Sequence, residues 1–181
     1  MKSIAIAALL ALAATPPVTA LADEDVKASP SCRHCGMDRE KFASSRMVVE
    51  YDDGSAVGTC SIHCAAVDLS VTLDKAPKAL KVADMATKQL IDAEKASWVL
   101  GGGKPGVMTK RAKWAFADRP AAEAYAKEVG GTVVGFEEAM KASYEDMYAD
   151  TKMIREKRKM MRQKAMEQKA GEQKPAEHKG H

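Results

Sequence analysis

The pattern of apolar and polar positions predicts two similar halves in the central part of the chain. Each half consists of a strand, a second strand, a helix and a third strand, with period-two alternation in the strands and helical spacing between them. The predicted elements of the first half are 47–51, 55–59, 62–72 and 80–86, with a hairpin signal at Asp52-Asp53-Gly54. Those of the second half, which begins at Gln89, are 97–100, 114–116, 119–129 and 132–135. We therefore expect an α+β fold of two related ββαβ units with antiparallel sheets.

A long helix is predicted to follow the two units. Its apolar residues recur every seven positions, at Met140, Met147, Ile154 and Met161. We expect its first half to pack on the domain and the remainder to be solvated. Beyond Gly171 the composition of Lys, Glu, Gln and Pro favours disorder. The predicted organisation is a signal peptide (1–22), two ββαβ units (23–87 and 88–136), a helix (137–170) and a disordered tail (171–181).

The N-terminal segment has the features of a cleaved export signal. Lys2 supplies the positive charge, residues 4–14 are apolar but too short to span a bilayer, and Ala20-Leu21-Ala22 fits a cleavage site. No cysteine follows the apolar run, so we expect no lipid anchor, and no other stretch predicts a membrane span. We expect a protein of the bacterial periplasm, an oxidising compartment.

Charge is unevenly distributed along the chain. The net charge is +3, but residues 151–181 contain 10 Lys or Arg against 4 Glu. Aromatic residues are few and do not alternate with the basic ones, so nucleic-acid binding is not indicated. We expect this basic segment to dock on an acidic partner surface and to contribute nothing to a metal site.

The candidate chemistry lies in four cysteines arranged as two close pairs. The first pair is Cys32-Arg-His-Cys35-Gly-Met37 and the second is Cys60-Ser-Ile-His-Cys64. Two such pairs can hold one soft metal ion, and Cys, Met and His together suit Cu(I). Met108 is added because it lies in a loop rich in Gly and Pro, where a large apolar residue has less reason to pack. The candidate ligands are Cys32, Cys35, Met37, Cys60, Cys64, Met108, His34 and His63.

The same residues allow other interpretations. Exported cysteines often form disulfides, and Cys32 with Cys35 would make a redox-active one. Four thiolates also make a closed tetrahedral Zn(II) site. Met37 can simply fill a core, and His34 and His63 can be solvated neighbours of the cysteines. A thiol oxidoreductase of the thioredoxin type is not indicated, since no Cys-x-x-Cys begins a helix in a βαβ unit.

Several motifs together resemble the NosL family of copper-binding proteins in nitrous oxide reductase maturation. They are Cys32-x-x-Cys35-Gly-Met37, Leu90-Ile91-Asp92-Ala93, Pro105 to Met108, Ala115-Phe116 and Gly130-Gly131. The resemblance implies a fold of two ββαβ units and copper delivery to nitrous oxide reductase or its assembly factors. The chain departs from the family in lacking a lipobox cysteine and in having Thr109 after Met108. The Cys60-Ser-x-x-Cys64 pair resembles small metal-sensing modules of the TRASH and YHS type.

The leading hypothesis is therefore a periplasmic Cu(I) chaperone, a binding protein and not an enzyme. The alternative is a structural or metal-sensing module stabilised by Zn(II) on the four cysteines. A carbon–mercury lyase is suggested by fold analogy alone. The sequence leaves the oligomeric state open.

Overall fold

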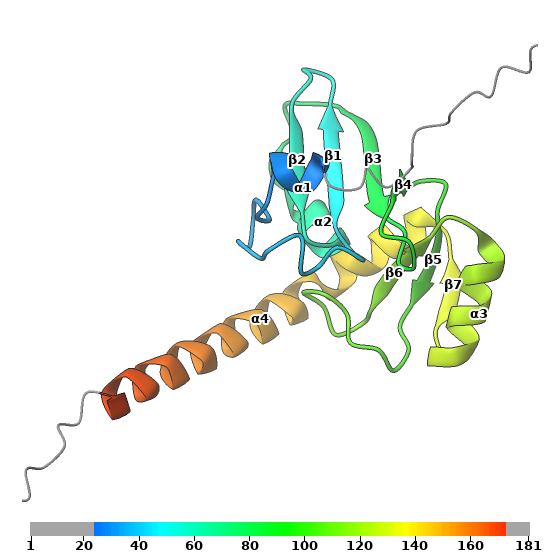
Figure 1. Ribbon diagram of the computed structural model, residues 1–181. Helices are drawn as coiled ribbons and strands as arrows, with labels where there is room; N and C mark the ends of the chain where they lie inside the picture. The colour runs from blue at the N-terminus through cyan, green and yellow to red at the C-terminus, as the bar shows by residue number, and fades with distance from the viewer. Residues whose placement is uncertain (1–23, 173–181) are drawn as a thin grey trace, which may run out of the picture.

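The computed structural model describes residues 24–172, which form two antiparallel sheets and four helices (Figure 1). The predicted signal peptide and nearly all of the predicted disordered tail lie outside these residues. The helices are α1 (Glu24–Ala28), α2 (Ile62–Val71), α3 (Arg119–Val129) and α4 (Phe136–Glu172). The strands are β1 (Met47–Tyr51), β2 (Ala56–Thr59), β3 (Pro77–Ala83), β4 (Leu90–Asp92), β5 (Ser97–Leu100), β6 (Lys113–Phe116) and β7 (Thr132–Val134).

The two sheets have the strand orders β2-β1-β3-β4 and β6-β5-β7. All strand pairs within them are antiparallel. In chain order, β1, β2, α2 and β3 make one strand–strand–helix–strand unit, and β5, β6, α3 and β7 make the other. The predicted α+β class, the antiparallel sheets and the long C-terminal helix are confirmed.

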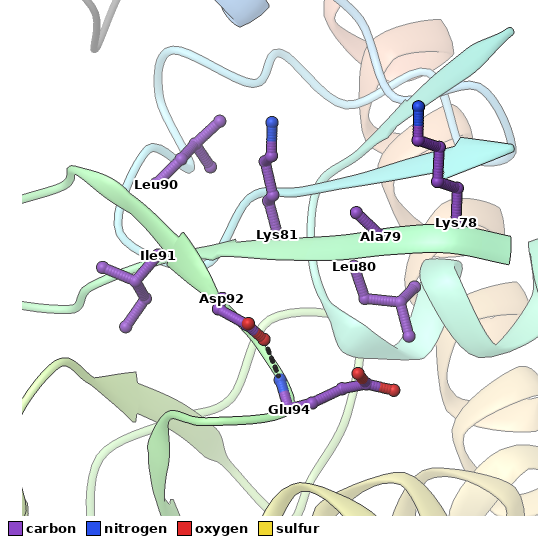
Figure 2. Close-up of a pocket in the computed structure, with 8 residues that line it drawn as sticks. All are labelled: Lys78, Ala79, Leu80, Lys81, Leu90, Ile91, Asp92 and Glu94. Atoms are coloured by element: carbon purple, nitrogen blue, oxygen red, sulfur yellow. Dashed lines mark hydrogen bonds between the residues drawn. The ribbon is translucent and has the colours of Figure 1, made fainter. Parts of the chain in front are cut away.

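The short strand β4 belongs to the first sheet. It pairs with β3 through Lys81 with Asp92, Val82 with Ile91, and Ala83 with Leu90. Figure 2 shows this edge, where the Asp92 carboxylate accepts the backbone N–H of Glu94 and turns the chain toward β5. The sequence analysis assigned this segment to the second half of the chain. A strand of only three residues has too short a pattern to indicate which sheet it joins.

The strand predicted at 80–86 lies three residues earlier than expected, at Pro77–Ala83. It ends at Asp84, whose Oδ1 accepts the backbone N–H groups of Ala86 and Thr87 and forms a turn. In the structure Pro77 is the first residue of the strand, a position where proline is tolerated.

One hydrophobic core joins the first sheet, α2, the second sheet and the start of α4. Trp98 of β5 is 1% exposed and donates its indole N–H to the Ala93 carbonyl at 2.9 Å. Its ring packs against Phe136, the first residue of α4, with 6.1 Å between ring centroids. The start of α4 is thereby fixed against both sheets.

A fully buried guanidinium, that of Arg39, links three segments near the cysteines. Its Nε donates to the Thr59 carbonyl, directly before Cys60, at 3.1 Å. Its Nη1 donates to the carbonyls of Asp25 and Ser29, each at 2.7 Å. Gly58 is required for this packing, because a Cβ there would lie 2.6 Å from Nη1 of Arg39.

The Asp25 carboxylate on α1 neutralises two buried arginines. It accepts from Nη2 of Arg39 at 2.7 Å and from Nε and Nη2 of Arg46 at 2.9 and 3.0 Å. The side chains of Arg39 and Arg46 are 0% and 1% exposed. Burial lowers the pKa of Arg39, and the adjacent Asp25 opposes this effect. The charges are tolerated because the guanidinium groups are both paired and hydrogen-bonded.

Helix α4 crosses the domain and then projects from it, as Figure 1 shows. Ala139, Ala142, Ser143 and Asp150 are buried, whereas residues 155–170 are exposed. In the part of the chain that the structure describes, none of the helices combines the length and apolar character needed to cross a membrane.

The first prediction concerns the Asp25 network. Replacing Asp25 by Asn should lower the free energy of unfolding by about 3–5 kcal/mol, because it leaves two buried guanidinium groups without a compensating charge. Urea unfolding followed by the fluorescence of the two buried tryptophans, Trp98 and Trp114, measures this change. Asp53→Asn is the matched control, because Asp53 pairs with Lys75 at an exposed site and should contribute little. Equal effects of the two variants would refute the structural role of Asp25.

Candidate metal centre

The first cysteine pair lies in a short closed loop. An antiparallel bridge between Ser31 and Asp38 closes this loop. Inside it, the Cys32 N–H donates to the Met37 carbonyl at 2.8 Å, and the Gly36 N–H donates to the Cys32 carbonyl at 2.9 Å. Gly36 has a φ of +73°, a left-handed conformation that glycine adopts without strain. These backbone bonds turn the side chains of both cysteines toward the second pair.

The second cysteine pair spans the junction between β2 and α2. Cys60 directly follows β2, and Cys64 lies in the first turn of α2. Ser61 between them has an extended backbone and occupies the N-cap position, with its carbonyl accepting the Ala65 N–H at 3.1 Å. The hydroxyl of Ser45 donates to the Cys60 carbonyl at 2.8 Å and holds this junction in place.

The four sulfurs meet in one cluster. All four Sγ atoms lie within 4.8 Å of one another. Cys60 Sγ is 3.4 Å from Cys35 Sγ and 3.7 Å from Cys64 Sγ. Four thiolates around one Zn(II) at about 2.3 Å would be roughly 3.8 Å apart. The spacing therefore suits one soft metal ion at the centre of the cluster.

The electrostatics of the cluster favour a bound cation. Hydrogen bonds from the S–H groups of Cys35, Cys60 and Cys64 lower the pKa of the Cys32 thiol. The adjacent Cys32, then Cys35, raise the pKa of Cys60 and of Cys64, and burial adds to this effect. Cys32 raises the pKa of Cys35, but hydrogen bonds from Cys60 and Cys64 outweigh this effect and that of burial, so the pKa of Cys35 is lowered as well. The first pair of thiols thus ionises more readily than the second, whose ionisation is disfavoured beside existing thiolates. Full deprotonation needs a positive ion among the sulfurs.

The four cysteines of the cluster differ in their exposure to solvent. Cys32, Cys60 and Cys64 are 2%, 0% and 2% exposed, and Cys35 is only partly buried. Cys35 lines a groove of about 540 Å³ together with Met37 and Phe42. Cys35 is therefore the most accessible of the four cysteines.

Met108 lies beside the cluster in a strained loop. Together with Met37, Phe42 and Val107 it packs against the buried cysteines. Its φ of +62° is unusual for a residue with a bulky side chain. Gly106 allows the loop to fold tightly, since a Cβ there would lie 2.7 Å from Thr109 Cγ2. Strain of this kind is retained where the position of a side chain matters.

The two histidines occupy different environments, and neither joins the group of four sulfurs. The Nε2 of His34 lies 2.7 Å from Oδ1 of Asp68 on α2, and Asp68 also accepts from the Tyr51 hydroxyl. This interaction ties the first cysteine loop to α2. That His34 or His63 binds metal remains a prediction.

His63 is buried between α2 and α4. Its Nδ1 lies 3.6 Å from Oδ2 of Asp150, and neither atom has a hydrogen-bond partner. Burial lowers the pKa of His63, and the charge of Asp150 opposes this. Asp150 of α4 therefore contacts the first turn of α2, the turn that also contains Cys64.

Helix α4 supplies site contacts that sequence reasoning missed. The Oδ1 of Asp150 accepts the Lys110 N–H at 3.1 Å, and Oδ2 of Asp146 accepts from Lys113 Nζ at 2.9 Å. These bonds hold the loop that contains Met108. Burial raises the pKa of Asp146, but hydrogen bonds from Arg111 and Lys113 outweigh it and leave the pKa below its usual value. No local sequence signal indicates these pairs, because 33 to 40 residues separate the partners.

The basic segment after residue 150 also reaches the site. Nη2 of Arg158 donates to the Cys35 carbonyl at 3.0 Å. Met153, Ile154 and Met161 line the groove that Cys35 also lines. The first part of the basic segment therefore lies against the site, and that the segment contributes nothing to metal binding remains a prediction. The seven-residue spacing predicted the apolar face of the helix but not what that face covers.

Comparison with known proteins agrees with this architecture. Residues 23–144, more than half of the chain, match the NosL family. Curated proteins gave no significant match. Among solved structures, the crystal structure of the copper chaperone NosL from Shewanella denitrificans superposes with a TM-score of 0.52. The two chains are 22% identical over 61% of this chain and 89% of that one, a likeness that concerns the fold. From the family match and the shared fold, the chain belongs to the NosL family.

Proposed function

We propose that this protein is an exported metallochaperone that binds Cu(I) and delivers it to a copper enzyme. The observation that carries the proposal is the convergence of four thiols with a single partly exposed member, Cys35. Its role is to hold and transfer an ion, not to catalyse a reaction. Nitrous oxide reductase, or an assembly factor of that enzyme, is the proposed recipient.

The choice of Cu(I) rests on the softness of the donors. Thiolate and thioether sulfur favour Cu(I), whereas carboxylate and carbonyl oxygen favour harder ions. Met37 and Met108 bring thioethers to the edge of the thiol cluster. The proposed ligand set is drawn from the four cysteines and these two methionines, with His34 and His63 as neighbouring candidates.

Delivery is supported by the asymmetry of the cluster. Three sulfurs are shielded from water, and Cys35 faces the groove. A partner thiolate or thioether can approach through the groove and bind the ion before the last internal bond breaks. Such exchange keeps the ion bound at every step, which a chaperone requires.

The setting is proposed from the family and from the sequence. The solved relative is described as a copper chaperone. The segment 1–22 has the composition of an export signal, which would place the protein in the periplasm. The recipient follows from the resemblance to copper-binding proteins of nitrous oxide reductase maturation.

A Zn(II)-stabilised module is the second candidate. It is favoured by one observation, the convergence of four thiols within 4.8 Å of one another, since structural Zn(II) sites are closed sets of four ligands. The two functions differ in what the metal does for folding. A structural Zn(II) site contributes folding free energy outright, and its removal unfolds the domain.

The second prediction separates these functions. Cys35→Ser should weaken Cu(I) binding by about 100-fold or more, because one soft anionic donor is lost. The fold should persist, since Cys35 is the least buried of the four cysteines. Competition with a Cu(I) chelator measures affinity, and circular dichroism measures the fold.

Arg33→Ser is the matched control for this substitution. It alters an exposed side chain in the same loop and keeps all four sulfurs. We expect affinity and fold to remain as in the wild type. If Cys35→Ser or removal of metal by a chelator unfolds the domain, the Zn(II) module is the correct function.

The third prediction concerns pH. The raised pKa values of Cys60 and Cys64 mean that these thiols carry protons in the metal-free protein at neutral pH. Binding must displace the protons, so affinity should rise with pH, by about tenfold per pH unit for each proton displaced. Chelator competition at weakly acidic and weakly alkaline pH checks this. An affinity independent of pH would indicate ligation by thioethers or carbonyls and would contradict the thiolate site.

A further inference from the structure

Four methionines line the groove that Cys35 also lines. Met37 and Met108 come from the loops beside the cluster, and Met153 and Met161 come from α4. We call this surface the thioether groove. Its α4 wall lies beyond residue 144, where the match to the NosL family ends. The wall is therefore a feature of this chain that the family match does not account for.

We infer that Met153 and Met161 make the thioether groove a second, weaker Cu(I) site, which loads the cysteine cluster. Cu(I) first binds thioethers in the groove and then passes to Cys35 and the buried thiolates. This inference rests on the proposed function and extends it to the route by which the ion reaches the cluster.

The transfer step is a ligand exchange without redox change. A bond from Cu(I) to a methionine thioether breaks as a bond to Cys35 Sγ forms, and any thiol proton leaves to solvent. Copper stays in the +1 state throughout. A thioether is neutral and a thiolate is anionic, so the cation is held more strongly at the cluster. The direction of transfer follows from this difference in charge.

The charged side chains that line the groove also favour transfer of Cu(I) from the groove to the cysteine cluster. Lys41, Lys157 and Arg158 line it, against the single acidic residue Asp38. Three positive side chains disfavour a resident cation, so binding in the groove is weak. The cluster beyond them is the more favourable place for the ion. Arg158 also binds the Cys35 carbonyl, which keeps α4 against the first cysteine loop.

The spacing on α4 indicates a route instead of one compact site. Met153 and Met161 are eight residues apart, about 12 Å along the helix axis at 1.5 Å per residue. This separation is larger than one coordination sphere. Lys157 lies between them on the same face, since positions four apart are neighbours on a helix. Each methionine can therefore bind the same weakly held ion at a different point along the groove, so the groove takes up one Cu(I) equivalent in all.

Two further methionines of α4 provide an internal control. Met160 and Met166 are 53% and 71% exposed and do not line the groove, whereas Met161 is 70% exposed and does. Exposure alone therefore does not distinguish the two sets. Replacement by Leu removes the sulfur and keeps the size and helix propensity, so neither set of changes should disturb the fold.

The experiment compares Met153→Leu/Met161→Leu with Met160→Leu/Met166→Leu in the full chain. Cu(I) is supplied as its bicinchoninate complex, and both the binding isotherm and the rate of loading by stopped-flow absorbance are measured. The groove variant should lose a second, weaker Cu(I) equivalent and load about tenfold more slowly, a change of about 1.4 kcal/mol. The affinity of the first equivalent should stay within about twofold of the wild type. The control variant should match the wild type.

Two results would overturn the inference. One is a groove variant that binds and loads as the wild type does, and the other is a control variant that loses the second equivalent equally. Failure of the proposed function would give a different experimental result. In that case the wild-type chain would take up no Cu(I) in any step, and both ideas would be rejected together.

Discussion

The buried guanidinium of Arg39 is the interaction on which the metal centre depends. It binds the carbonyls of Ser29 and Thr59, which lie just before the first and second cysteine segments, and the carboxylate of Asp25 balances its charge. The two segments are therefore fixed relative to each other by a group that is not itself a ligand. Because this network holds the backbone on both sides, it supports the convergence of the four sulfurs within 4.8 Å of one another.

Ionising four neighbouring thiols costs free energy, and a bound metal cation lowers that cost. Four thiols within 4.8 Å of one another cannot all ionise without a cation, and burial of three of them makes this cost larger. A structural Zn(II) site is a closed set of four ligands without an open position. The exposure of Cys35 at the thioether groove allows transfer of the ion, because a ligand of another protein can reach an ion bound there. The proposed chaperone thus combines a shielded interior for retention with one accessible sulfur for exchange.

Local patterns predicted much of the fold, and they predicted the cysteine cluster. Hydrophobic alternation predicted β1 and β5, and helical spacing predicted α3, whose start is capped in the structure by the Asp118 side chain. The spacing of the cysteines indicated a shared site. The pairing of β4 was not predictable, since its three residues suit either sheet. Neither were the contacts of Asp146, Asp150 and Arg158, which join residues far apart in the chain. Heptad spacing predicted an apolar face on α4 but contained no information about the loops that this face meets.

The central claim is that the four cysteines bind Cu(I) through sulfur. X-ray absorption at the copper edge tests it most directly, on reduced full-length protein loaded anaerobically with one equivalent of Cu(I). The account predicts a first shell dominated by sulfur, in keeping with the soft donors around Cys35. A first shell composed only of nitrogen and oxygen would contradict it.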